Sequence, residues 1–349
     1  SVVSHPLTFT THPFIISRVM IFIDNTHTDP RLNLAMEEFI LRNLRFPEPI
    51  LFFYINEPAV IIGRNQNTLE EIDPDYVQAK GIHVVRRLSG GGAVYHDLGN
   101  LNFSFVTAAG PDNFHNFARF TEPVIQVLRQ LGVKAELREQ SSIFVNGKKI
   151  SGNAQYATSG RMFSHGTLLF NTNIETMLHA LNPRQVQIES KAVQSVRNFV
   201  TNIHEHLPQD MTIHELRQAL LLGIFEVNDA AAIPTYTLSD ENWTAIQQIS
   251  AQRYANWEWN FGHSPRFNVQ KSERLPIGKI DARISVENGR IQQIKFYGDF
   301  SGEQDLAGLE ARLTGVRYER EALAAAIHTL NLTPYFGPLD PATFLSFIY

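Results

Sequence analysis

The sequence predicts an α+β protein, in which a large mixed-sheet domain with helices precedes a small C-terminal α+β domain. Strand-like segments alternate with scattered helical segments instead of regular β–α repeats, which disfavours a doubly wound parallel sheet. Residues 228–247 are rich in Ala, Thr, Asp and Asn with weak periodicity, which indicates a linker. We therefore expect a leader-like or tag-like segment at 1–19, a large domain at 20–247 and a small domain at 248–349.

The composition is that of an ordinary globular protein and excludes several classes. The 349 residues suffice for two or three domains at roughly 150 residues each. A net charge of −5 leaves no basic footprint for a nucleic-acid binder, and no apolar run approaches the ~18 residues of a membrane span. The absence of cysteine excludes disulfides, Cys-ligated zinc, iron–sulfur clusters and a thiolate nucleophile.

Apolar spacing and turn residues predict the first elements. Met20 followed by Ile-Phe-Ile-Asp is typical of a natural start, so residues 1–19 receive no functional role. Helical spacing from Leu32 to Leu44 predicts a helix that Pro47 stops. Strands are predicted at 51–62 with a turn at 56–58, at 83–87, and at 100–105, where polar and apolar residues alternate; a helix follows at about 116–131.

The remaining elements are marked by turns and caps. Asn146-Gly147 predicts a hairpin between 143–145 and 148–150, followed by a strand at 165–170. Thr212 and Glu215 form a capping box, which opens a helix to about Phe225. In the small domain we expect a hairpin around Asn288-Gly289, a helix ending at Gly315 and another from about Glu319.

The densest chemical segment is Arg86 to Asp97. Its three consecutive glycines allow successive backbone N–H groups to approach one anion, and the two preceding arginines supply cations suited to phosphate or carboxylate. The alternative is a Gly-rich hairpin with two surface arginines, which the glycines alone would favour. The segment is neither a Walker A motif nor a dinucleotide fingerprint.

Four further segments carry candidate residues. Lys148 and Lys149 face opposite sides of a strand, so at most one points inward, and the alternative is that both are solvated. His165 is placed on a strand edge, as a core or hydrogen-bonded histidine. The loop 191–198 is a solvated loop or a mobile lid, and the aromatic residues of 257–261 suggest a packing seam between the domains. No histidine spacing matches a metal site, so metal ligands stay unknown.

In combination, these segments resemble the lipoate–protein ligase A family. The matching stretches follow in family order from about residue 20 to the C-terminus, and they are 33–38, 62–67, 86–100, 149–152, 165–169, 195–197 and 257–262. The resemblance implies a class II synthetase/biotin-ligase-like catalytic domain at 20–247 and an accessory domain at 248–349. It also implies a two-step reaction, in which lipoate and ATP form lipoyl-AMP and a lysine of an acceptor protein then takes the lipoyl group.

The resemblance also assigns residues, cofactors and partners. Lys149 is the expected catalytic residue, which contacts both lipoate and ATP. The other ATP-binding residues are Arg87, Gly92, Ala93, Val94 and Tyr95. Lipoate is expected to contact Leu34, Met36, Arg87, Ser89, Gly90, Gly91, Asn100 and His165, and the loop residues Lys191, Ser195, Val196 and Arg197 are expected to close over the adenylate. Mg²⁺ is the implied metal, E2 lipoyl domains of 2-oxoacid dehydrogenases or the glycine-cleavage H protein are the implied partners, and a cytoplasmic location is expected.

Two features of the sequence, its lack of cysteine and the residues before the lysine hairpin, bear on alternative functions. Octanoyltransferases of the same superfamily use a cysteine nucleophile, and a chain without cysteine excludes that mechanism. The family's usual Arg-Asn-Asp before the lysine hairpin is replaced here by Gln140-Ser141-Ser142, so a carboxylate that Mg²⁺ would favour becomes a hydroxyl. The alternative function is therefore a lipoyltransferase that uses preformed lipoyl-AMP. A non-catalytic lipoate-binding or carrier-binding module is disfavoured, because it needs no α-phosphate cradle.

Overall fold

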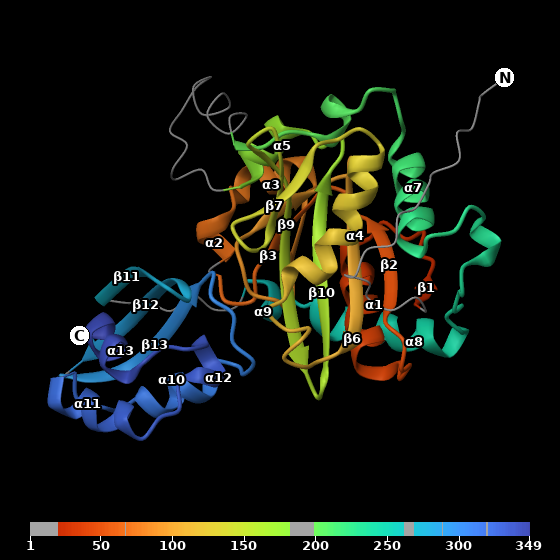
Figure 1. The fold of residues 1–349 in the computed structure, drawn as a ribbon. Coiled ribbons are helices and arrows are strands. Elements are labelled where there is room, and N and C mark those ends of the chain that lie inside the picture. The colour runs from red at the N-terminus through yellow and green to blue at the C-terminus, as the bar shows by residue number, and fades with distance from the viewer. Residues whose placement is uncertain (1–19, 67, 182–198, 262–268, 288, 319) are drawn as a thin grey trace. The chain divides into compact units, whose positions relative to one another are not determined.

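The fold is that of a computed structural model, which describes residues 20–66, 68–181, 199–261, 269–287, 289–318 and 320–349 (Figure 1). The predicted segment 1–19 and the predicted loop residues Lys191, Ser195, Val196 and Arg197 lie outside these ranges. The chain forms two compact units. The first contains the described part of Ser1–Val60 with Ile72–Val85 and Tyr95–Asn256; the second contains Ile61–Glu71, Arg86–Val94 and Trp257–Tyr349. The predicted α+β class is confirmed, and the domain boundary at 247 stays a prediction.

A seven-stranded mixed sheet forms the centre of the first unit, in the order β1-β2-β6-β10-β9-β8-β7 (Figure 1). Only β1 pairs with its neighbour in parallel, and the other five pairs are antiparallel. The strands are β1 Ile21–Ile23, β2 Ile50–Ile55, β6 Asn100–Ala108, β7 Ala135–Arg138, β8 Ser142–Val145, β9 Lys148–Thr158 and β10 Arg161–Leu169. The predicted hairpin is confirmed, because Asn146 and Gly147 join β8 to β9 with φ of 49° and 78°.

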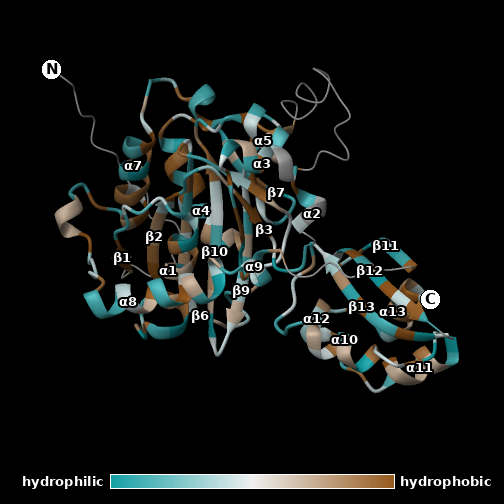
Figure 2. Ribbon diagram, turned by 180° about the vertical axis from the view of Figure 1, so that it is seen from behind, coloured by the Kyte–Doolittle hydropathy of each residue, from teal (hydrophilic) through white to brown (hydrophobic). Residues whose placement is uncertain are grey.

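The sheet has two chemically different faces, because side chains alternate along each strand. One face carries Phe103 and Phe105 and packs in an apolar core against α4 (Phe117–Gln130) and α7 (Ile213–Phe225). The opposite face carries Asn102, Ser104 and His165 and contacts α1 (Pro30–Asn43). In Figure 2 the hydrophobic colour follows β2, whose strand core is fully buried. The polar residues of this sheet therefore lie on the α1 face.

The long helix α1 buries two acids among its apolar residues. It begins with Pro30 in its first turn, after Asp29, whose carboxylate accepts the N–H of Arg31 at 2.8 Å. Glu37 and Glu38 are only 2% and 3% exposed. Buried carboxylates need hydrogen-bond or charged partners, so each must be matched by another element of the fold.

The residues after α7 do not form the predicted linker, and this expectation is wrong. The segment contains a 3₁₀ turn at Ala230–Ala232 and then α8 (Asp240–Ile249), which contacts α1. A capping box between Ser239 and Asn242 opens α8, and Ile246 is fully buried. Because α8 buries only a narrow stripe at Ile246, its apolar periodicity is too weak to predict a helix from the sequence.

Shorter elements complete the first unit and connect the chain between the units. The helices are α3 Pro74–Lys80 and α5 Ile174–Ala180, with a 3₁₀ turn at Ile203–His206 and a π-helical turn at Ser250–Tyr254. A small sheet in the order β4-β3-β5 consists of β3 Ala59–Ile62, β4 His83–Arg86 and β5 Val94–His96. The glycine-rich segment follows β4, as predicted.

The second unit contains a three-stranded antiparallel sheet, which packs with helices around its own apolar core. The strands are β11 Val269–Leu275, β12 Gly278–Glu287 and β13 Arg290–Gly298. The helices are α2 Thr68–Glu71, α9 Trp257–Asn260, α10 Ala307–Leu313, α11 Arg320–His328, α12 Thr333–Phe336 and α13 Pro341–Ile348. No described helix has both the length and the hydropathy needed to cross a membrane.

A tight backbone approach at Gly99 gives a first test of the fold. A Cβ at Gly99 would lie 2.1 Å from the carbonyl oxygen of Asn171, whereas a Cβ at Gly110 would meet nothing within 4 Å. We expect Gly99→Ala to cost about 1–3 kcal/mol of stability and to lower the melting temperature by several degrees. Gly110→Ala is the matched control, and equal melting temperatures for the two variants would show that the approach at Gly99 is not tight.

Candidate functional site

Lys149 lies near the start of β9 and has a half-buried ammonium group. Its carbonyl accepts the N–H of Thr201 at 3.1 Å, which fixes the backbone on one side. A Cβ at Gly152 would lie 3.4 Å from Cε and 3.5 Å from Nζ of Lys149, which is ordinary van der Waals contact, so the lysine side chain extends along the sheet face beside Gly152. Among the described residues, Nζ has neither an ion pair nor a hydrogen bond. It is a cation suited to an anionic ligand.

Burial lowers the pKa of Lys149 from its ordinary value, and the negative charge of Glu139 acts in the opposite direction. Glu139 lies in the turn between β7 and β8. The side chain of Lys149 is thus the inward lysine of the predicted pair. Lys148 instead lines a separate polar pocket.

Ser142, which stands where the family pattern usually has an aspartate, lies on the same sheet face as the Lys149 ammonium. Ser142 is directly paired with Gly152 in the β8–β9 register, and paired residues point to the same side of a sheet. Ser142 is 4% exposed, and the Gly152 N–H donates to Thr167 Oγ1 at 3.1 Å. A carboxylate at position 142 would therefore lie close to the ammonium, which the sequence alone did not indicate.

His165 is held by a buried carboxylate on α1. Nδ1 of His165 lies 3.0 Å from both oxygens of Glu37, and its ring packs at 4.6 Å from that of Phe163. The expectation of a hydrogen-bonded histidine is confirmed, but its place on a strand edge is wrong, because β10 lies between β6 and β9. Sequence reasoning missed Glu37, although an acid in the middle of an apolar helical stripe was the available signal.

The neighbouring acid Glu38 anchors α1 to the π-helical turn. It accepts from Arg42 at 2.7 Å, from Arg253 at 3.0 Å and from the Tyr254 hydroxyl at 3.0 Å. Burial and the adjacent carboxylates raise the pKa of Tyr254 well above its usual value, so it stays a donor. These three partners give the buried Glu38 a structural role. Glu37 is therefore the buried acid of α1 that contacts a candidate site residue, His165.

Asn100 begins β6 in a buried amide chain. Its Nδ2 donates to Asn102 Oδ1 at 3.0 Å, and Asn102 Nδ2 donates to the carbonyl of Tyr54 at 3.2 Å. Among the described residues the buried Oδ1 of Asn100 has no hydrogen-bond partner. The predicted lipoate residues Leu34 and Met36 are buried on α1. This first unit thus supplies an apolar helix beside polar strand residues.

Tyr95 belongs to the first unit, at the end of the glycine-rich segment. Its side chain is 3% exposed, and burial raises the pKa of its hydroxyl above the usual range, so it is neutral near neutral pH. Two residues later, Asp97 accepts the N–H groups of Gly99 and Asn173 at 2.9 and 2.8 Å. Asp97 therefore fixes the turn that leads to Asn100.

Arg87 and the glycine-rich loop lie in the second unit. The guanidinium of Arg87 donates to the carbonyls of Gly90 and Gly92 at 2.6 and 2.9 Å and to Ser89 Oγ at 2.9 Å. Because C=O and N–H point in opposite directions in a trans peptide, the N–H groups of Gly91 and Ala93 point away from Arg87. The alternative of surface arginines is wrong, since Arg87 is 5% exposed.

The candidate residues therefore fall into two groups. The first unit brings Lys149, His165 and Asn100 onto neighbouring strands of one sheet, with Leu34 and Met36 on α1 and with Tyr95. The second unit contains Arg87, Ser89, Gly90, Gly91, Gly92, Ala93 and Val94. No group of three or more His, Asp or Glu side chains suited to a metal occurs in the described parts of the chain.

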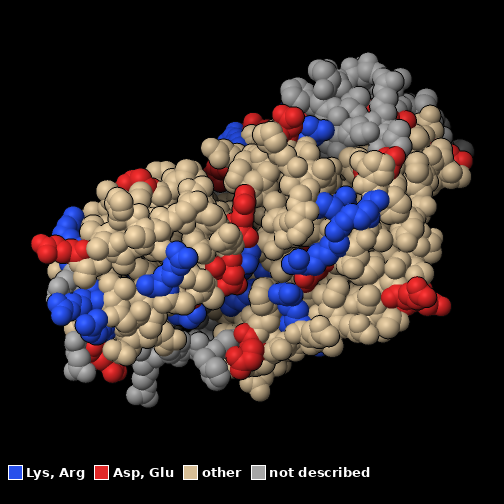
Figure 3. All heavy atoms as spheres, turned by 90° about the horizontal axis from the view of Figure 1, so that it is seen from below, with Lys and Arg blue, Asp and Glu red and all other residues tan. Residues whose placement is uncertain are grey.

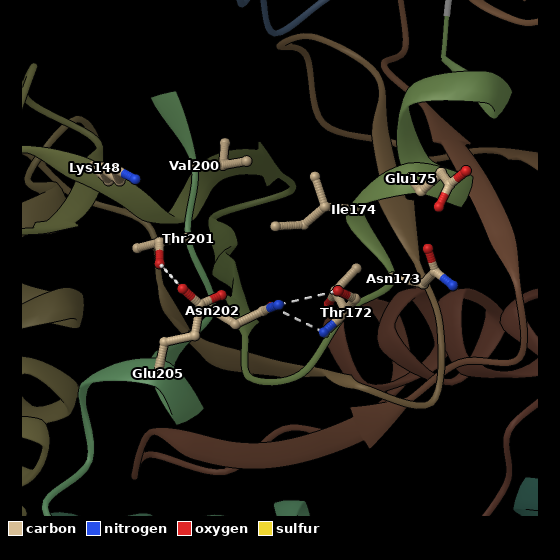
Figure 4. A pocket seen from close by; sticks show the side chains of 9 residues that line it. All are labelled: Lys148, Thr172, Asn173, Ile174, Glu175, Val200, Thr201, Asn202 and Glu205. Atoms are coloured by element: carbon tan, nitrogen blue, oxygen red, sulfur yellow. Dashed lines mark hydrogen bonds between the residues drawn. The ribbon is translucent and has the colours of Figure 1, made fainter. Parts of the chain in front are cut away.

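A polar pocket of about 580 Å³ opens beside the start of β9 (Figure 4). Thr201 Oγ1 donates to Glu205 at 3.1 Å, and Asn202 exchanges two hydrogen bonds with the backbone of Thr172. Lys148 adds a cation to the lining. These groups suit a polar molecule and do not suit an acyl chain. On the face seen in Figure 3, basic and acidic side chains lie side by side and form no single basic surface.

The ammonium of Lys149 gives a test of the site that needs no substrate. We expect the pKa of Lys149 to lie below that of the exposed lysines, and Glu139→Gln to lower it further, because a stabilising negative charge is lost. NMR of ¹³C-methylated lysines measures both values, and Lys149→Arg identifies the signal. Glu136→Gln is the matched control on β7. A titration midpoint of Lys149 unchanged by Glu139→Gln would contradict this electrostatic account.

Comparisons with known proteins point to one family along most of the chain. A model of the lipoyl protein ligase A/B catalytic domain matches residues 29–225, and a model of the bacterial lipoate protein ligase C-terminus matches 264–348. The chain is 52% identical over 331 residues to lipoate-protein ligase LplJ of Bacillus subtilis, which covers 95% of this chain and 100% of that protein.

Two solved structures are similar in fold and sequence. One is a bipartite lipoate protein ligase of Thermoplasma acidophilum studied with its E2 lipoyl domain, with a TM-score of 0.62, 31% identity and coverage of 72% of this chain and 98% of that one. The other is a lipoate-protein ligase A bound with ATP, with a TM-score of 0.59, 31% identity and coverage of 70% and 98%.

Proposed function

Because this chain belongs to the lipoate–protein ligase family, we propose that Lys149 is the cation that holds lipoate and ATP together for reaction. The enzyme is a ligase that works in two steps. In the first step, a carboxylate oxygen of lipoate bonds to the α-phosphorus of ATP, and pyrophosphate leaves. In the second step, a lysine amine of the acceptor bonds to the acyl carbon, loses a proton and releases AMP.

The position and positive charge of the Lys149 ammonium are the observation that supports this proposal. The first step brings a carboxylate and a phosphate together, so a fixed cation has to offset their repulsion. Among the described residues the ammonium of Lys149 has neither a hydrogen bond nor an ion pair, and it lies beside Gly152 on the sheet. Burial lowers the pKa of Lys149, and the negative charge of Glu139 partly offsets this by favouring the ammonium form.

The glycine-rich loop is proposed as the nucleotide-binding element. The N–H group of Ala93, which points away from Arg87, is a donor for a phosphate oxygen, and the other proposed ligands are Gly92, Val94 and Tyr95. Arg87 supports the loop through its carbonyls and adds positive charge at the same time. A loop preorganised in this way loses little free energy in rearrangement when the charge develops.

The lipoate-binding role of the α1 face is proposed from its mixed lining. Leu34 and Met36 are apolar and buried, which suits an acyl chain, while Asn100 and the Glu37-bound His165 supply polar contacts. Ser89, Gly90 and Gly91 stay predicted contacts of the carboxyl end. An apolar lining discriminates weakly between acyl chains of similar length, so we expect octanoate to compete with lipoate.

Mg²⁺, the acceptor and the location complete the proposal. Mg²⁺ is proposed to arrive with the phosphates of ATP, since Mg²⁺ is commonly bound through one or two carboxylates and substrate phosphates. The proposed acceptors are E2 lipoyl domains or the glycine-cleavage H protein; the archaeal neighbour studied with its E2 lipoyl domain supports the first. The cytoplasmic location stays a prediction. The comparisons do not favour the alternative, a lipoyltransferase restricted to preformed lipoyl-AMP.

Exchange of labelled pyrophosphate into ATP measures the first step directly. We expect exchange that depends on lipoate, and we expect Lys149→Ala to lower its rate by about 10²-fold, which corresponds to roughly 3 kcal/mol of transition-state stabilisation. Lys148→Ala is the matched control, because that side chain lines the polar pocket instead. Near-normal exchange in folded Lys149→Ala would refute the catalytic role, and a wild-type protein that only transfers from lipoyl-AMP would select the alternative.

The serine that replaces the family's carboxylate gives a second kinetic test. Ser142→Asp would place a carboxylate on the face of the Lys149 ammonium, where it raises the pKa of Lys149 and offers Mg²⁺ a hard ligand. We expect a higher exchange rate or activation at lower Mg²⁺ concentration. Ser141→Asp, one residue earlier, is the control. Identical Mg²⁺ titrations for Ser142→Asp and the wild type would contradict the hypothesis that replacing the carboxylate by a hydroxyl weakens the activation step.

A further inference from the structure

We propose that Arg86 is a positioning residue, which fixes the glycine-rich loop 89–94 through the neighbouring loop 63–66 and so sets the affinity for ATP. The inference rests on the proposed nucleotide-binding function of loop 89–94. Arg86 is the last residue of β4 and is 8% exposed. It adjoins Arg87 in the chain, but its hydrogen-bond partners are different.

The guanidinium of Arg86 binds the inner side of loop 63–66. Nη1 donates to the carbonyls of Gly63, Arg64 and Gln66 at 2.8, 3.1 and 2.7 Å. Three carbonyls of one short loop thus converge on a single nitrogen atom. The positive charge compensates the mutual repulsion of the three carbonyl dipoles, so the loop conformation depends on this cation.

Loop 63–66 in turn contacts loop 89–94. The N–H of Arg64 donates to the carbonyl of Ser89 at 2.9 Å. A Cβ at Gly63 would lie 1.9 Å from the carbonyl oxygen of Gly91, so the two backbones touch directly. A shift of loop 63–66 would therefore displace the carbonyl groups of the glycine-rich loop, together with the N–H groups on their opposite sides.

The rest of Arg86 is fixed by α9 and α2. Nε donates to the carbonyl of Trp259 at 2.9 Å, and Nη2 donates to Thr68 Oγ1 at 2.7 Å and to the carbonyl of Asn260 at 3.3 Å. The backbone is held as well, since Arg86 N donates to Asn260 Oδ1 at 2.9 Å and Trp259 Nε1 donates to Arg86 O at 2.8 Å.

Only a planar guanidinium can serve these acceptors together. Arginine offers five N–H donors in a rigid plane, whereas lysine offers three donors from one atom. Burial lowers the pKa of Arg86 to about 10, so it stays charged at neutral pH. Arg86→Lys therefore keeps the charge, loses Nε and one of the two Nη groups, and should loosen loop 63–66 without removing a ligand of the nucleotide.

Hydrogen–deuterium exchange of the full-length protein without substrates tests the positioning role. We expect Arg86→Lys to speed exchange in peptides that cover 63–66 and 89–94, and Thr68→Val to do so more weakly, because it removes the hydroxyl acceptor at similar shape. Thr68→Ser keeps the hydroxyl and is the matched control. Unchanged exchange of 89–94 in Arg86→Lys would overturn the proposal.

Steady-state kinetics separates positioning from general stability. We expect Arg86→Lys to raise KM for ATP about tenfold in the pyrophosphate assay. A lower melting temperature with an unchanged KM for ATP would show a merely structural role and would overturn the proposal. A wild-type protein without pyrophosphate exchange would refute the proposed function instead, and the deuterium exchange would still report on the loops.

Discussion

Buried positive charge is the constraint on which the candidate residues of both units depend. Arg86 and Arg87 are held mainly by carbonyl and hydroxyl oxygens, which satisfy their donors and fix the loops around them. Lys149 differs, because among the described residues its ammonium has neither a hydrogen bond nor an ion pair, and only the charge of Glu139 acts on it from a distance. A protein that binds a carboxylate and a triphosphate has to bring cations into a partly buried place, and neutral acceptors do so without cancelling the charge.

The two faces of the large sheet divide stability from chemistry. The face against α4 and α7 is apolar and forms the main core, so its contribution to folding does not depend on the ligand. The face against α1 buries Asn100, Asn102 and the Glu37–His165 pair. Such groups cost free energy unless each finds a partner, and the fold therefore supplies an amide chain and a carboxylate–histidine pair there.

The chemistry of a ligase agrees with the absence of cysteine. ATP activates the acyl group, so the enzyme needs no covalent intermediate and requires positioning and charge instead. Ser142 lies on the Lys149 side of the sheet, where a carboxylate would raise the pKa of the lysine. The hydroxyl leaves Lys149 with less negative charge around it.

The sequence by itself determined the α+β class, the hairpin at Asn146-Gly147 and the family, because these depend on local turn chemistry and on ordered motifs. It did not determine that Glu37 binds His165 or that Arg86 gathers carbonyls from 63–66 and from α9, since such partners are far apart in the chain. The linker at 228–247 was misjudged for the same reason: α8 is stabilised by packing on α1, which local periodicity does not contain. Tertiary contacts determined which charged residues are buried. Burial in turn determined their pKa values and which partners they need.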